Sequence, residues 1–179
     1  MFAKKKKYSF VSLILTAMFS IFLLVPYASA YVYYDGGYPS ATYKLDFGYS
    51  RYNSTWTNRI SAAVSSWNST STPVWITNDG TSSNKVYAAN YADSWYGLYT
   101  PSTNWLGSVT SFNIKLNSRT LNADAYNWDH FVESTTVHEI GHSLSLDHNN
   151  NTSIMNSGRD RNTMYKPQTD DINGVNAYY

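Results

Sequence analysis

The stretch that decides the fold lies near the end of the chain, at residues 138–148, and reads HEIGHSLSLDH. Its first two histidines, His138 and His142, are four residues apart, so on a helix they lie one turn apart on the same face and can bind one metal ion. Glu139 lies beside them, close enough to reach a metal-bound water without being a ligand. Because such a water needs a base when it attacks a carbonyl, the pattern predicts Glu139 as the catalytic residue.

The third histidine of this stretch, His148, follows His142 by six residues. A continuous helix would carry it about 9 Å along the axis, which is too far to share a metal bonded at about 2.0–2.1 Å. The helix must therefore end near Ser145, and the chain must fold back. Three neutral imidazoles with one open position are typical of a catalytic zinc site, although imidazole also suits copper, nickel or iron.

The rest of the chain has the pattern of an α+β domain, with strands first and helices at the end. The active-site stretch predicts a helix over residues 129–144, which packs on the core through its apolar face and presents its histidines to a cleft. Another helix begins near residue 53 or 54 and ends before Pro73, because Trp56, Ile60, Val64 and Trp67 recur at helical spacing. Alternating or apolar runs predict strands at residues 42–47, 74–77, 85–91, 96–100 and 108–116. Residues 117–128 read as a polar loop, and residues 169–178 as a third helix capped by Thr169.

Taken with the segment Ser153-Ile154-Met155 that follows it, the stretch at 138–148 resembles the metzincin zinc peptidases. Within them it is most similar to the matrixins, the matrix-metalloproteinase-like group, and the chain looks like a small secreted member of bacterial type. Residues 170–178 are similar to the matrixin terminal helix, and residues 42–45 to its first strand. The resemblance implies a twisted five-stranded mixed sheet, two long helices, and a C-terminal helix after the Met-turn.

The resemblance also implies roles for the site residues. It makes His138, His142 and His148 zinc ligands, and it makes Glu139 the general base and acid. Met155 would pack beneath the metal. A substrate would lie extended along a sheet edge, with its S1′ pocket between the active-site helix and residues 156–166.

Three departures from the family pattern bear on these roles. The family usually has glycine where this chain has Ser145, and the left-handed turn expected there costs a non-glycine residue about 1–2 kcal/mol. The chain has no cysteine, so it cannot block zinc with a propeptide thiolate. His130 is the one histidine outside the motif; we expect it to be structural, and we do not expect a second, histidine-rich zinc site.

The first thirty residues have the pattern of a signal peptide. A basic run at residues 4–7 precedes an apolar stretch at 10–25, and Ala28-Ser29-Ala30 forms a small-x-small cleavage site. Cleavage would leave residues 31–179 as one catalytic domain, with nine basic against twelve acidic residues. This balance argues against nucleic-acid binding, and no second apolar stretch could anchor the mature chain in a membrane. We therefore expect a secreted, extracellular monomer.

Two oxygen-rich groups of residues leave alternatives open. Asn122, Asp124, Asn127 and Asp129 could hold calcium, although a solvated polar turn is the simpler interpretation. Asp170 and Asp171 suit the N-terminus of the last helix, and the resemblance adds that they could tie down the Met-turn or the new amino group of Tyr31. Asp147 could compete with His148 as an oxygen ligand, but imidazole fits the family better.

The sequence therefore predicts a secreted zinc-dependent endopeptidase acting on protein or peptide substrates. Its mechanism would be hydrolysis by a zinc-bound water activated by Glu139. Two alternatives stay open: a secreted zinc-binding module that has lost turnover, and a zinc hydrolase acting on a non-peptide amide such as a cell-wall bond.

Overall fold

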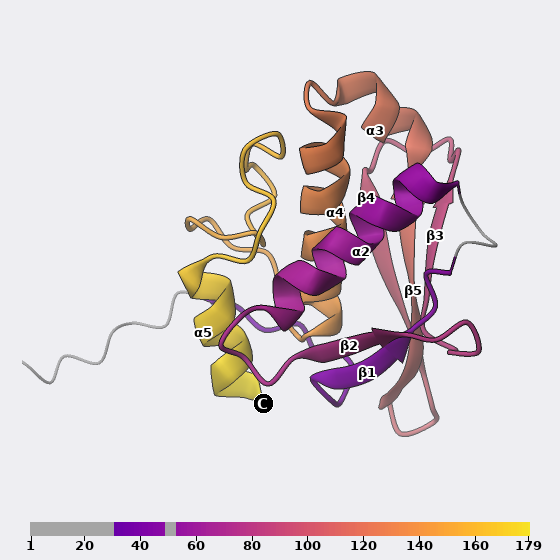
Figure 1. Ribbon diagram of the computed structural model, residues 1–179. Helices are drawn as coiled ribbons and strands as arrows, with labels where there is room; N and C mark the ends of the chain where they lie inside the picture. The colour runs from indigo at the N-terminus through magenta and orange to yellow at the C-terminus, as the bar shows by residue number, and fades with distance from the viewer. Residues whose placement is uncertain (1–30, 49–52) are drawn as a thin grey trace, which may run out of the picture.

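The computed structural model describes residues 31–48 and 53–179, so the predicted signal peptide lies outside the described residues. Two long helices, α2 (Ser54–Asn68) and α4 (Trp128–Ser143), cross beside the strands, and Figure 1 shows α5 (Thr169–Tyr178) on the side away from the three-stranded sheet. In the part of the chain that is described, no helix has the length and apolar character needed to cross a membrane.

In the described part of the chain, five strands form two small sheets. In the first sheet, β1 and β2 pair in parallel, and in the second, β5 lies between a parallel neighbour, β3, and an antiparallel one, β4. A single bridge between Asp46, directly after β1, and Lys85, the first residue of β3, links the two. The mixed α+β class is confirmed, whereas the predicted continuous five-stranded sheet is replaced by two sheets joined at one bridge. The strands are β1 (Thr42–Leu45), β2 (Trp75–Asn78), β3 (Lys85–Ala89), β4 (Gly97–Thr103) and β5 (Val109–Asn117).

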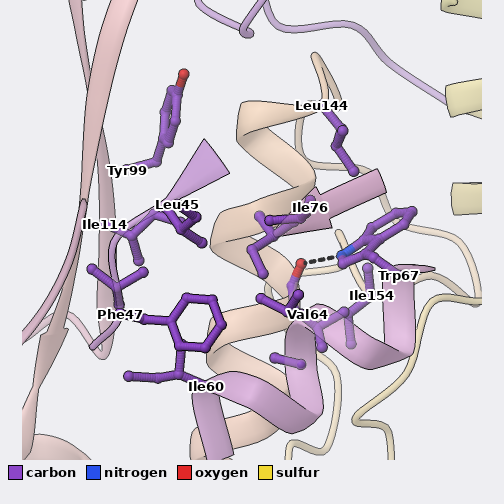
Figure 2. Close-up of a cluster of buried hydrophobic side chains, with 14 of the residues drawn as sticks. Leu45, Phe47, Ile60, Val64, Trp67, Ile76, Tyr99, Ile114, Leu144 and Ile154 are labelled. Atoms are coloured by element: carbon purple, nitrogen blue, oxygen red, sulfur yellow. Dashed lines mark hydrogen bonds between the residues drawn. The ribbon is translucent and has the colours of Figure 1, made fainter. Parts of the chain in front are cut away.

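The core lies between the strands and the crossing helices. Ile60, Val64 and Trp67 on α2 are buried, which confirms the apolar stripe predicted from their spacing. The indole Nε1 of Trp67 donates a 3.0 Å hydrogen bond to the carbonyl of Val137 on α4, drawn as a dashed line in Figure 2. This bond satisfies a buried donor and fixes α2 against the helix that carries the first two histidines.

The structure corrects two predictions about the helices and adds to a third. Residues 117–128 do not form a loop throughout, because α3 (Ser118–Asp124) begins after Asn117, whose side chain accepts from the Arg119 N–H, and buries Leu121. Helix α4 is more deeply buried than its apolar face alone required, since every residue from 131 to 141 is buried. The cap of α5 is Gln168 and not Thr169; the Asp171 carboxylate accepts from the Gln168 N–H at 2.7 Å.

Strand β4 forms an edge of the second sheet, since its one paired neighbour is β5. Its first residue, Gly97, lies against α4, where an added Cβ would come within 2.5 Å of the Glu139 Oε1 and 2.8 Å of the Thr135 Cγ2. Glycine in a strand often marks such a close approach. The free edge of β4 therefore runs directly beside the active-site helix.

Candidate active site

The helix α4 supplies two of the three histidines and then ends sharply. Leu144 caps it, and the Leu146 N–H returns to the carbonyl of Gly141 at 3.0 Å. Between them Ser145 has φ 66°, the left-handed conformation expected at this position. The reversal brings His148 back over the helix, as the spacing of the histidines requires.

The three imidazoles converge on one point. The Nε2 atom of His148 lies 3.0 Å from the Nε2 of His138 and 3.2 Å from the Nε2 of His142, and one ring nitrogen from each lies within 4.8 Å of the others. Two nitrogens bonded to one tetrahedral zinc at about 2.0–2.1 Å would lie about 3.4 Å apart. The spacing of the donors therefore fits a single ion.

Backbone carbonyls fix the tautomers of the two helical histidines. The Nδ1 of His138 donates to the Ile154 carbonyl at 2.8 Å, and the Nδ1 of His142 donates to the Leu146 carbonyl at 2.9 Å. A carbonyl can only accept, so each Nδ1 carries the proton and each Nε2 presents a lone pair. A hydrogen bond of this kind is the usual outer partner of a metal-ligating histidine.

Burial keeps these two rings neutral. It lowers the pKa of His142 to about 4 and the pKa of His138 well below its usual range. The Nε2 atoms of His138 and His142 therefore carry no proton, and both lie about 3 Å from the Nε2 of His148. Two imidazole lone pairs directed at one place, with a third imidazole nitrogen beside them, form a donor set that suits a metal ion.

Glu139 is buried beside this cluster, at 5% exposure. Burial raises the pKa of its carboxyl to about 7, against the opposing influence of the Arg159 guanidinium and a hydrogen bond from the backbone N–H of Tyr99. A carboxyl whose pKa lies near neutral pH can both accept and return a proton, which is what a general base and acid needs.

A cleft opens along the edge of β4 above the histidines. Three residues of β4 line it together with Glu139 and the second and third histidines. Tyr34, from the segment before β1, also lines it, and its ring meets that of His142 edge-on with centroids 5.7 Å apart. The lining residues are Tyr34, Gly97, Leu98, Tyr99, Glu139, His142, Asp147 and His148.

The segment Ser153–Met155 lies under the cluster and is tied to α5. The carboxylate of Asp171 accepts from the Ser153 hydroxyl and from the backbone N–H groups of Ile154, at 2.8 Å, and Met155, at 3.4 Å. Met155 is buried, and its sulfur packs so closely on Gly141 that a Cβ there would collide with it. Asp171 therefore holds the turn whose Ile154 carbonyl orients His138, the first of the two roles considered for this aspartate.

The other residues considered as ligands bond elsewhere. His130 stacks on Tyr165, with ring centroids 3.9 Å apart, and its Nδ1 lies 2.8 Å from the Asn162 carbonyl, so it is structural as expected. The carboxylate of Asp147 accepts from the His148 backbone N–H. The oxygen-rich loop residues are each engaged separately: Asn122 with Trp128, Asp124 with Tyr96, Asn127 with the His130 N–H, and Asp129 with Arg59. Within the described residues, the group of three or more side chains suited to a metal is the histidine triad.

Comparison with known proteins agrees with this geometry. The sequence pattern of the matrixin family matches residues 56–179. The chain belongs to the matrixin family. Among solved structures, this matrixin is similar to the GM1-bound form of the ECX AB5 holotoxin, with a TM-score of 0.54 and 16% identity over 83% of this chain and 84% of that one. At that identity the likeness concerns the fold alone, and no curated protein matches the sequence.

Several residues that shape the site of this matrixin were not predicted from the sequence. For Gly97 there was one signal of a close approach, a glycine inside a predicted strand. For Gly37 the sequence held no such signal. A Cβ there would overlap Ser145, so the absence of a side chain makes room for the turn before His148. Arg159 is buried beneath the helix, where its guanidinium donates to the Ser134 hydroxyl and carbonyl and to the Asn156 carbonyl.

Proposed function

We propose that this matrixin is a secreted zinc-dependent endopeptidase. The observation that carries the proposal is the convergence of three imidazole nitrogens beside a buried carboxyl, in a pocket that the first residues of the edge strand β4 also line. Retention of Glu139 matters here, because metal binding alone does not need that side chain.

His138, His142 and His148 would hold the zinc, and the site fits it by the spacing and protonation of the donors. Bound zinc would supply a Lewis acid that polarises a carbonyl and lowers the pKa of water to about 7. The carbonyls of Ile154 and Leu146 keep the Nε2 lone pairs directed at the ion. Loss of either would leave the ring free to rotate away.

Glu139 would carry the proton. Its carboxylate would take a proton from the attacking water and deliver it to the leaving amine, which a pKa near 7 suits in both directions. The N–H of Tyr99 orients the carboxylate, and the missing side chain at Gly97 leaves it room.

The substrate would bind as an extra strand on the free edge of β4. The Tyr99 N–H is already bonded to Glu139, and Pro101 has no N–H, but the other outward backbone groups of β4 are not paired with β5. An extended peptide could use these groups, which is a common mode of peptide recognition. Export by the leader at residues 1–30 would place the enzyme outside the cell, where protein substrates are met.

The test uses the chain from Tyr31 onward, incubated with an unfolded protein with and without a chelator. We expect cleavage that the chelator abolishes and that added zinc restores. The matched control is Glu139→Ala, which should bind one zinc ion and cleave nothing. A parent protein that binds zinc without cutting the substrate would overturn the proposal in favour of a binding module, and cleavage confined to non-peptide amides would favour the other hydrolase.

A further inference from the structure

Arg161 has an unusual environment two residues beyond the buried Arg159. Its guanidinium carbon lies 4.8 Å from the centroid of the Tyr96 ring and 5.9 Å from that of Phe131. The two rings pack edge-on against each other at 5.1 Å. A guanidinium stacked in this way is held in one plane, with its fork of donors in a fixed direction.

Most of the hydrogen-bonding capacity of Arg161 is unused. Of its five N–H bonds, one reaches the Ser157 carbonyl, at 3.3 Å from Nη2. Among the described residues, the buried Nε atom has no hydrogen-bond partner. None of the ion pairs found among those residues involves Arg161. The terminal N–H groups of this half-buried cation could therefore donate to a carboxylate.

The neighbours of Arg161 place it near Glu139 and the start of β4. Phe131, Thr135 and Glu139 are four residues apart, so they share one face of α4. Thr135 and Glu139 lie against Gly97, and Tyr96 precedes that residue directly. Arg161 therefore lies beside Tyr96, just before the first residue of β4, and it is near enough to Glu139 to interact with it electrostatically.

The direction of β4 tells which part of a substrate would meet this cation. Strand β4 runs from Gly97 to Thr103, away from Arg161. A peptide added in the antiparallel sense, the more frequent pairing, would run from the Thr103 end toward the Tyr96 end. Its residues after the scissile bond would therefore lie on the Arg161 side.

We propose that Arg161 is a specificity-determining residue that selects an acidic side chain directly after the scissile bond, with glutamate preferred to aspartate. The inference rests on the proposed function, because it takes the cut to occur above Glu139. Glutamate reaches one methylene further than aspartate toward a guanidinium held over the Tyr96 ring. The carboxylate would accept two N–H bonds from the fork, and such charge-assisted pairs are about twice as strong as neutral ones.

The first measurement maps the cuts made in an unfolded protein by mass spectrometry and then compares peptides that differ only in Glu, Asp, Gln or Leu after the cut. We expect kcat/KM to be about tenfold or more higher for Glu than for Gln. In Arg161→Met, which keeps a long side chain against Tyr96, the ratio should fall to about one. In Arg161→Glu the preference should shift to lysine. Arg59→Gln, which removes a partly buried cation on α2, is the control and should leave the ratio unchanged.

A second measurement does not depend on turnover. The Nε–H resonance of Arg161 is followed by NMR in Glu139→Gln protein titrated with the capped tripeptides Ala-Glu-Ala and Ala-Gln-Ala. We expect a saturable shift with the first that is absent with the second. Cleavage without an acidic preference after the cut, or an equal response to both peptides, would overturn the inference about Arg161 while leaving the peptidase proposal intact. A selective shift, found together with a parent protein that cleaves no substrate, would support the role of Arg161 in binding and count against the peptidase.

Discussion

Gly97 is the residue whose size bears most directly on the chemistry of the site. Glu139 can lie beside β4 because nothing projects from that position, and a methyl group there would press on its carboxylate at 2.5 Å. We predict that Gly97→Ala lowers kcat/KM about tenfold to a hundredfold, since displacing a catalytic group by about 1 Å can cost this much, while zinc content stays at one ion per chain. Peptidase assays with metal analysis would measure both. The control is Gly80→Ala, where an added Cβ meets no atom within 4 Å; equal activity in the two variants would refute the prediction.

Glu133 offers a residue-scale test of electrostatics on the opposite face of α4. Its carboxyl is buried, with the Arg59 guanidinium 3.9 Å away, and burial raises its pKa despite that cation. A folded pKa above the unfolded value of about 4.3 means that the unfolded chain loses this proton first as pH rises. The free energy of unfolding therefore falls from about pH 4 upward, until the pH exceeds the folded pKa.

Replacing that carboxyl by an amide should remove this pH dependence. We predict that Glu133→Gln melts close to the parent at pH 4 and above it at pH 7.5, as measured by thermal denaturation of the zinc-loaded protein. Asp129→Asn, which alters the exposed carboxylate that also faces Arg59, should show no such growing gap. A difference in melting temperature between Glu133→Gln and the parent that narrows as pH rises would contradict the raised pKa of Glu133.

At the scale of elements, α5 holds the Met-turn, the segment Ser153–Met155, in place through hydrogen bonds. Its first turn provides Asp171, which is 1% exposed and receives hydrogen bonds from Ser153, Ile154, Met155 and Gln168. In Asp171→Asn one acceptor oxygen becomes a donor facing other donors. We expect a loss of about 1–3 kcal/mol in the free energy of unfolding and zinc binding weakened about tenfold to a hundredfold, because Ile154 orients His138.

Zinc titration would measure the change in zinc affinity, and denaturant melts would measure the change in the free energy of unfolding. Asp170→Asn is the matched control, because Asp170 accepts a bond from Asn149 at 3.1 Å and lies outside the buried network. The role of Asp171 would be disproved if Asp171→Asn bound zinc as tightly as the parent, or if the two variants lost equal zinc affinity and equal stability.

The elements differ in how far sequence reasoning could reach them. Helix α2 and the histidine stretch have strong periodicity or fixed spacing, so their positions could be predicted to within a few residues. Helix α3 could not be predicted, because it is short and mostly polar and depends on the Asn117 cap and the burial of Leu121. The burial of residues 131–141 of α4 could not be predicted either, because it results from other segments of the chain packing around that helix.

On the scale of the whole molecule, the site is an assembly of segments distant in sequence. The helix α4, the edge of β4, the segment before β1 and the turn before α5 each contribute contacts that no local pattern encodes. The roles of the three histidines could be predicted because their spacing suits one metal ion, and the role of Met155 because its position resembles the Met-turn of the family. The roles of Gly37, Gly97 and Arg161 depend on which segments become neighbours, and single-residue signals for that are weak or absent.

The central claim is that the rings of His138, His142 and His148 bind one zinc ion together. X-ray absorption at the zinc edge of the purified protein from Tyr31 onward tests it most directly. The account predicts three imidazole nitrogens at about 2.0–2.1 Å and one further light atom, with one nitrogen lost in His148→Ala. A spectrum with two imidazoles, or one that His148→Ala leaves unchanged, would contradict it.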